Sequence, residues 1–145
     1  NESIKLLSEL DNSIKIDLIK NKDEILLNCD KEQLTRVFIN LIKNSIESIE
    51  EKSKKVTNFE KKISIEISQI SDHIKIILLD NGLGFNEIKG RIKDILNPYF
   101  TTKKNGTGLG LSIVNKIISD HNGKLNFFPT KDGAKIEIIF NINVD

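Results

Sequence analysis

The stretch NGTGLGLSIVNKIISDHNG, residues 105–123, places three glycines directly before an apolar segment with helical spacing and ends on a fourth. Gly106, Gly108 and Gly110 are three of only eight glycines in the chain. A flexible loop followed by an ordinary helix, from about 109 to 121, would explain the pattern. Alternatively, consecutive glycine amides before a helix N-terminus form a nest for phosphate. The spacing matches neither a P-loop nor a dinucleotide-binding fingerprint, so the rest of the chain must decide.

The composition is that of one ordinary globular domain. The chain has 145 residues, 38% hydrophobic and 30% charged, with a formal net charge of +1. So small a charge does not favour nucleic acid or a membrane surface as partner. The single cysteine, Cys29, excludes an internal disulfide and a cysteine zinc site, and suits a reducing compartment. His73 and His121 lack metal-ligand spacing. Because the chain opens without Met, we expect a piece of a longer protein.

Apolar periodicity predicts alternating strands and helices. Asp30 stands as the N-cap of a long helix beginning at residue 31, ahead of apolar residues at helical spacing. We expect a polar loop over 51–61 and antiparallel hairpin pairs of strands. The fold class predicted is α+β: a two-layer sandwich in which helices cover one face of a mixed, mostly antiparallel sheet. The remaining expected elements are a helix at 2–10, a helical turn within 87–95, and strands at 13–20, 25–29, 62–70, 73–80, 124–128 and 134–142.

Two asparagines on the long helix form the first candidate site. Asn40 and Asn44, in FINLIKNSIES, lie one turn apart on one helix face, within an otherwise apolar neighbourhood. They could be ordinary polar residues on the helix margin. Their amide oxygens could also face a hydrated cation and a nucleotide, since hard cations take oxygen ligands.

The second candidate site is LLDNGLGF, residues 78–85, where an apolar strand ends at Asp80. A carboxylate at the end of a buried strand can accept a hydrogen bond from an exocyclic amine such as that of adenine. Gly82 and Gly84 would let a base approach the main chain closely. A simple Asp-Asn-Gly turn is the alternative.

The third candidate site is NPYFTTKKNG, residues 97–106. Pro98, Tyr99 and Phe100 form an aromatic anchor in a polar connection. The anchor could belong to a lid over a bound ligand, or it could fill the core; both could hold together.

In order and spacing, these motifs resemble the ATP-binding catalytic domain of two-component sensor histidine kinases, in the GHKL superfamily. Residues 40–48 resemble its N box, 80–85 its first glycine box, 98–103 its F box and 106–111 its second glycine box. The resemblance covers about 13–141 and is greatest to the nitrogen-sensor subgroup, the NtrY- and NtrB-type kinases.

The resemblance implies ATP and Mg²⁺ as cofactors. Asn44 would bind Mg²⁺, and Asn40 would contact phosphate or the ion's water. Asp80 would hold the adenine amino group, and residues 82–107 would form the ATP lid. The residues implied to contact the nucleotide or its ion are Asn40, Asn44, Glu47, Asp80, Gly82, Gly84, Phe85, Phe100, Thr101, Thr102, Lys103, Gly106, Thr107, Gly108, Leu109, Gly110 and Leu111.

Two substitutions bear on the chemistry. ATPases of the superfamily carry a Glu where this chain has Asn40, and an amide cannot act as the base that activates water. The site therefore suits phosphoryl transfer to a nucleophile from elsewhere. Many relatives carry a basic residue at the position of Glu47. Lys103 and Lys104 are the candidates for neutralising the phosphates here, and the alternative is that they are ordinary solvated lysines.

The resemblance also implies partners. The phosphoacceptor would be a histidine on a separate dimerisation domain, to which residues 1–10 would lead, because neither His73 nor His121 lies in a matching context. A response regulator receiver domain would take the phosphoryl group onward. We expect a cytoplasmic, monomeric fragment of a homodimeric parent, and anchoring of that parent in the inner membrane stays open. The alternatives are a stand-alone GHKL ATPase or serine kinase and a nucleotide-sensing module without transfer activity.

Overall fold

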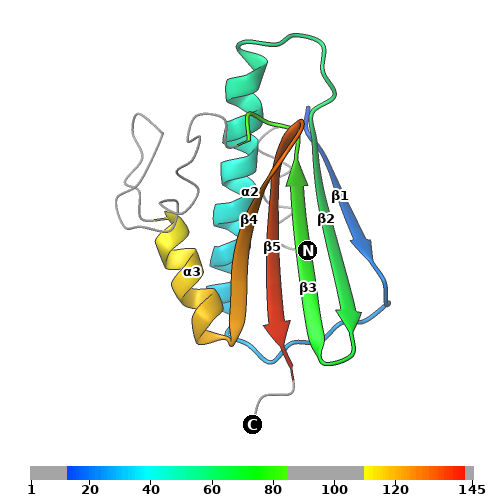
Figure 1. Ribbon diagram of the computed structural model, residues 1–145, viewed down its shortest axis with the longest axis vertical. Coiled ribbons are helices and arrows are strands. Elements are labelled where there is room, and N and C mark those ends of the chain that lie inside the picture. The colour runs from blue at the N-terminus through cyan, green and yellow to red at the C-terminus, as the bar shows by residue number, and fades with distance from the viewer. Residues whose placement is uncertain (1–12, 85–109, 143–145) are drawn as a thin grey trace.

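The computed structural model describes residues 13–84 and 110–142, which form a sheet covered by helices. The strands are β1 (Lys15–Lys20), β2 (Lys62–Ile70), β3 (His73–Asp80), β4 (Gly123–Thr130) and β5 (Gly133–Asn141), and the helices are α2 (Lys31–Ser53) and α3 (Gly110–Asp120). The strand order in the sheet is β1-β2-β3-β5-β4. Figure 1 shows α2 and α3 on one face of this sheet, which confirms the predicted α+β sandwich.

Most of the sheet is antiparallel and one edge of it is parallel, so the sheet is mixed and mostly antiparallel, as predicted. β2 pairs with β3, β3 with β5 and β5 with β4, all antiparallel, whereas β1 pairs with β2 in parallel. A parallel pair requires a crossover connection, and α2 supplies it between β1 and β2. The predicted strand at 25–29 is therefore wrong: this segment is irregular and leads from β1 into the helix. Leu26 within it is 72% exposed.

The core fills the space between the sheet and the two helices. Alternate residues of β2 and β3, such as Ile63, Ile65 and Ile76, are buried, as the period of two requires. α2 contributes the buried residues predicted from its periodicity, among them Leu41 and Ile49. One face of each strand therefore packs on the helices.

The structure confirms the predicted start of α2 and extends the helix beyond residue 51. Asp30 caps α2 as expected, since its Oδ1 accepts a hydrogen bond from Gln33 N at 3.1 Å. The helix continues through Ser53, so the polar loop begins later than residue 51. The expected helix at 2–10 and helical turn within 87–95 lie outside the described residues.

His121 joins the ends of the two helices. Its Nε2 accepts a hydrogen bond from Asp30 N at 3.0 Å, and its Nδ1 lies 2.7 Å from Ile117 O. Because a carbonyl only accepts, Nδ1 is the donor in this contact. The Nε2 contact therefore links the end of α3 to the start of α2, while the Nδ1 contact stays within the last turn of α3.

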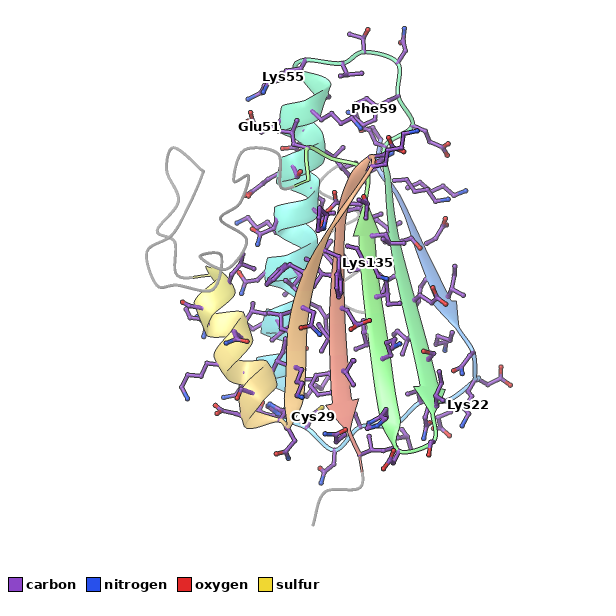
Figure 2. The ribbon with its side chains drawn as sticks, in the orientation of Figure 1. Lys22, Cys29, Glu51, Lys55, Phe59 and Lys135 are labelled. Carbon is purple, nitrogen blue, oxygen red and sulfur yellow. The ribbon has the colours of Figure 1, made fainter. Side chains whose placement is uncertain are left out.

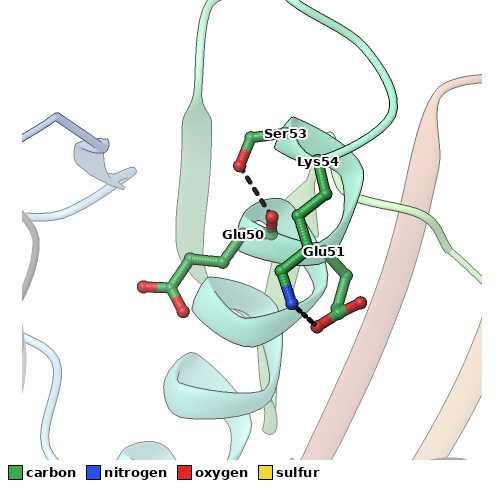
Figure 3. A network of polar contacts seen from close by, with 4 residues as sticks. All are labelled: Glu50, Glu51, Ser53 and Lys54. Atoms are coloured by element: carbon green, nitrogen blue, oxygen red, sulfur yellow. Dashed lines mark hydrogen bonds and ion pairs between the residues drawn. The ribbon is translucent and has the colours of Figure 1, made fainter.

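Exposed polar side chains such as Lys22, Glu51 and Lys55 point away from the sheet and helices (Figure 2). At the end of α2, Lys54 Nζ contacts Glu51 Oε1 at 2.8 Å and Ser53 Oγ donates to Glu50 O at 2.6 Å (Figure 3). Among the residues that the structure describes, no helix has the length and apolar character needed to cross a membrane.

Candidate functional site

Asp80 is the buried charged residue at the centre of the candidate site. It ends β3, pairs with Ile63 of β2 and Ala134 of β5, and is 9% exposed. Its Oδ2 accepts a hydrogen bond from Ser45 Oγ at 2.8 Å, and its Oδ1 accepts one from Gly82 N at 3.0 Å. Each carboxylate oxygen can accept more than one hydrogen bond. Asp80 can therefore also accept a hydrogen bond from a ligand.

Burial and hydrogen bonding act on the Asp80 charge in opposite directions. Burial is the larger effect and raises the pKa of this carboxyl above its ordinary value. The Gly82 N–H, the Ser45 hydroxyl, the Ala134 N–H and the Lys52 ammonium all favour the ionised form and limit the rise. Such a balance between desolvation and specific partners is frequent at functional sites.

The turn after Asp80 is held by α2 on one side. Ser48 Oγ accepts a hydrogen bond from Leu83 N at 2.9 Å. Lys52 Nζ donates to Asn81 O at 2.8 Å. Ser45 binds the Asp80 carboxylate in the same way. Three side chains of α2, those of Ser45, Ser48 and Lys52, therefore bind successive residues of the turn. The turn is fixed relative to α2 before any ligand arrives.

The start of β2 holds the same turn on its other side. The Asn81 side chain accepts a hydrogen bond from Lys62 N at 2.9 Å and donates to Glu60 O. The Asn81 N–H donates to Lys62 O at 3.3 Å. Asn81 therefore extends the pairing of β2 with β3 by one residue.

Packing within the protein accounts for three glycines around Asp80. A Cβ on Gly82 would lie 2.4 Å from Ser48 Oγ, and one on Gly84 would lie 2.4 Å from Gly133 O. Gly84 also has φ +68°, which side chains rarely adopt. A Cβ on Gly133 would lie 1.9 Å from Asp80 O. The sequence suggested that these glycines allow a nucleotide base to approach the main chain. In the structure, the segments that pack closely around the turn are α2 and β5.

Asn40 and Asn44 lie on α2, as predicted, and both are half-buried. Asn40 Oδ1 faces the first residue of α3, because a Cβ on Gly110 would lie 3.9 Å from it. The structure thus brings the N-terminal end of α3 beside the first asparagine. Glu47 is half-buried as well, and its Oε2 is shielded from solvent. Leu111 lies in the first turn of α3.

The other predicted contact residues lie outside the described residues. They are Phe85, Phe100, Thr101, Thr102, Lys103, Gly106, Thr107, Gly108 and Leu109, together with Lys104. Within 13–84 and 110–142, no group of three or more His, Cys, Asp or Glu side chains is arranged to hold a metal ion.

Sequence reasoning missed four residues that shape the site: Ser45, Ser48, Lys52 and Asn81. One signal was available. Ser45 follows Leu41 by one turn and is 2% exposed, and a hydroxyl within a buried helix face requires a polar partner. Nothing comparable indicated Lys52 or Asn81, since a lysine near a helix end and an asparagine in a turn are both common.

The fold agrees with the comparisons with known proteins. Residues 29–144 match the profile of the histidine kinase-, DNA gyrase B-, and HSP90-like ATPases. The chain belongs to this family, as its motifs predicted.

Individual relatives narrow the likeness to sensor histidine kinases. A sensor histidine kinase of Rickettsia bellii, described as NtrY-like, is 34% identical over 98% of this chain, which spans 22% of that protein. The sensor histidine kinase ZraS of Escherichia coli is 34% identical over 86% of the chain and 25% of the relative. The two identities are equal, so the nitrogen-sensor subgroup stays a prediction.

Solved structures of the histidine kinase ThkA have the same fold. Its catalytic domain superposes with a TM-score of 0.81 at 27% identity, covering 97% of this chain and 88% of that one. ThkA in complex with the response regulator protein TrrA gives a TM-score of 0.76 at 24% identity, covering 98% of this chain and 39% of the other.

Proposed function

We propose that this chain is the ATP-binding catalytic domain of a sensor histidine kinase, which transfers the γ-phosphoryl group of ATP to a histidine on a separate dimerisation domain. The observation that carries the proposal is the buried Asp80 carboxylate, held by Ser45 on the helix that carries Asn40 and Asn44. Helix α2 therefore positions both the candidate contact with the adenine base and the candidate contacts with phosphate and metal.

In this proposal Asp80 accepts a hydrogen bond from the adenine amino group. An ionised carboxylate is an acceptor only, so it suits an amine better than a carbonyl. The two hydrogen bonds from Ser45 and Gly82 fix its orientation before the base arrives. Gly84 supports the turn beside it.

Asn44 binds Mg²⁺ and Asn40 contacts phosphate or the ion's water. Mg²⁺ takes oxygen ligands, keeps several waters and is commonly bound through substrate phosphates, so one or two amide oxygens fit its needs. Asn40 Oδ1 faces the start of α3, where helix amides favour negative charge. The bound ion would neutralise charge on the phosphates during transfer.

The remaining roles are those that the motifs imply. Amides of Gly106, Gly108 and Gly110 would lie along the phosphates, residues 82–107 would form the ATP lid with Phe100 as its anchor, and Lys103 and Lys104 would neutralise phosphate charge. Glu47, Phe85, Thr101, Thr102, Thr107, Leu109 and Leu111 complete the contacts with nucleotide.

The chemistry is transfer rather than hydrolysis, because Asn40 cannot activate water as a base. The domain positions ATP and stabilises charge, and the nucleophile comes from another domain. The domain would be cytoplasmic, and the parent protein would be a homodimer that passes the phosphoryl group to a receiver domain. The ThkA complex with its response regulator supports this partner.

A transfer assay tests the proposal. The domain is mixed with radiolabelled ATP, Mg²⁺ and a dimerisation fragment that contains the acceptor histidine, and acid-labile phosphate is measured on the fragment. We expect transfer by the wild type and by Asn126→Ala, an exposed asparagine of β4, and none by Asn44→Ala. Normal transfer by folded Asn44→Ala would contradict the metal assignment.

Two further outcomes would identify the alternatives. ATP hydrolysis without an acceptor, or phosphate on serine, would favour the stand-alone ATPase or serine kinase. Tight binding of ATP without transfer to any acceptor would favour a nucleotide-sensing module.

A further inference from the structure

We propose that Lys52 is a positioning residue for nucleotide binding, acting through the peptide bond between Asn81 and Gly82. The inference rests on the proposed function, because it concerns how Asp80 is kept ready for adenine. Lys52 has no role in the motifs that identify the family, and it lies two turns after Ser45 on the same helix face.

Lys52 is held in place by two neighbours. Its ammonium donates to Asn81 O at 2.8 Å and lies 4.7 Å from the centroid of the Phe59 ring. A lysine over an aromatic face is attracted by the ring quadrupole. Phe59 precedes β2 and lies near the end of α2 (Figure 2). The side chain thus joins α2, the loop before β2 and the turn after β3.

The peptide that Lys52 binds is the one that donates to Asp80. The carbonyl of Asn81 and the N–H of Gly82 belong to a single planar unit, and in a trans peptide they point in opposite directions. Lys52 binds the carbonyl end, while the N–H end donates to Asp80 Oδ1 at 3.0 Å. Fixing the carbonyl therefore aims the N–H at the carboxylate.

The charges at the two ends strengthen this arrangement. A cation at the carbonyl and an anion at the N–H polarise the peptide in the same sense, and hydrogen bonds in such a chain reinforce one another. The Lys52 charge also favours the ionised form of Asp80.

A lock on this peptide is needed because its second residue is glycine. A peptide before glycine can rotate into turn geometries that other residues resist. Rotation would replace the N–H facing Asp80 Oδ1 with a carbonyl oxygen, which repels a carboxylate. Asp80 would then lose both a donor and its fixed orientation.

The test compares Lys52→Met with Lys52→Arg and with Lys43→Met, which alters an exposed lysine of the same helix. Met keeps most of the side-chain stem but removes the charge and the donor, whereas Arg keeps both. ADP affinity is measured by calorimetry, and the Gly82 amide resonance is followed by NMR. Both measurements are made under conditions in which the variants and the wild type are equally folded. A transfer assay gives KM for ATP and kcat.

We expect Lys52→Met to weaken ADP binding on the order of tenfold, the range for losing a charged hydrogen bond. KM should rise with kcat little changed, and the Gly82 resonance should shift. Lys52→Arg should recover most of the affinity, and Lys43→Met should bind as the wild type does.

Lys52→Met that melts earlier but binds ADP normally, with an unchanged Gly82 resonance, would overturn the proposal by showing a purely structural role. Lys52→Gln, which keeps a neutral donor, provides a second variant for the same comparison. The proposed function fails differently, since a wild-type domain unable to bind ADP would contradict it whatever Lys52 does.

Discussion

Helix α2 carries two polar networks that differ in what they can do. In one, Ser45, Ser48 and Lys52 hold the turn that begins at the buried Asp80. In the other, Glu51 and Lys54 pair at the exposed end of the helix (Figure 3). Buried polar contacts are costly to break, whereas exposed ion pairs contribute little. The burial of a polar network, rather than the number of its contacts, therefore distinguishes the candidate site from the exposed end of the helix.

The two carboxylates of these networks have pKa values shifted in opposite directions. Burial raises the pKa of Asp80 despite its hydrogen bonds. The hydrogen bond from Lys54, and then the charge of Lys54, lower the pKa of the exposed Glu51. Folding thus works against the charge on Asp80 and favours the charge on Glu51.

Gly133→Ala should have the largest effect on the buried network. The new Cβ would lie 1.9 Å from Asp80 O and 2.9 Å from Asn81 Cα, both backbone atoms that cannot move independently. We expect loss of several kcal/mol of folding free energy, as for overpacking against backbone. Urea unfolding followed by circular dichroism measures it. A variant as stable as the wild type would show that the turn is not fixed as described.

Ser45→Ala removes one hydroxyl from the buried network. Ser53→Ala is the control, because it removes a hydroxyl from the exposed end of the same helix. Ser45→Ala removes a donor to a buried carboxylate and should cost about 1–3 kcal/mol. Ser53→Ala removes an exposed hydrogen bond to Glu50 O and should change stability by less than about 0.5 kcal/mol. Equal losses of stability would erase the distinction between the two networks.

The pH dependence of stability should reveal the raised pKa of Asp80. The folded protein binds this proton more tightly than the unfolded chain, so ionisation of Asp80 opposes folding. That destabilisation is complete above the folded-state pKa and disappears as pH falls below the ordinary value of 3.8. Asp80→Asn should therefore gain more stability over the wild type at pH 7 than at pH 4, by urea unfolding. An advantage that grows on acidification would mean that the pKa is lowered instead.

Glu51→Gln should have the smallest effect. Its partner Lys54 is 69% exposed, so water and salt screen the pair. We expect no resolvable change in the unfolding midpoint and no change in nucleotide affinity. A clear loss of stability that salt reduces would show that the exposed pair contributes more than its position suggests.

The sequence predicted the helix pair and most of the sheet because hydrophobic periodicity reports which face is buried. It misassigned 25–29, where apolar residues in a connection imitate a strand. The error arose from expecting a hairpin, since no local signal shows that β1 pairs in parallel with a strand that follows α2.

The sequence predicted only those residues of the candidate site whose role can be inferred from their neighbours in the sequence. Asp80 could be identified because a strand ending in a carboxylate before glycines is a recognisable pattern. Lys52 and Asn81 could not, because their partners are distant in sequence: Lys52 binds Asn81 across the fold, and Asn81 binds Glu60 and Lys62. Such contacts depend on the helix lying against the turn, which no pattern of residue types specifies.

The most direct test of the central claim is calorimetric titration with ADP, with and without Mg²⁺, of the wild type and Asp80→Asn. The account predicts that the wild type binds ADP, that Mg²⁺ tightens the binding, and that Asp80→Asn weakens it by about 1–3 kcal/mol while staying folded. Absence of binding by the folded wild type at millimolar ADP, or equal affinity in Asp80→Asn, would contradict it.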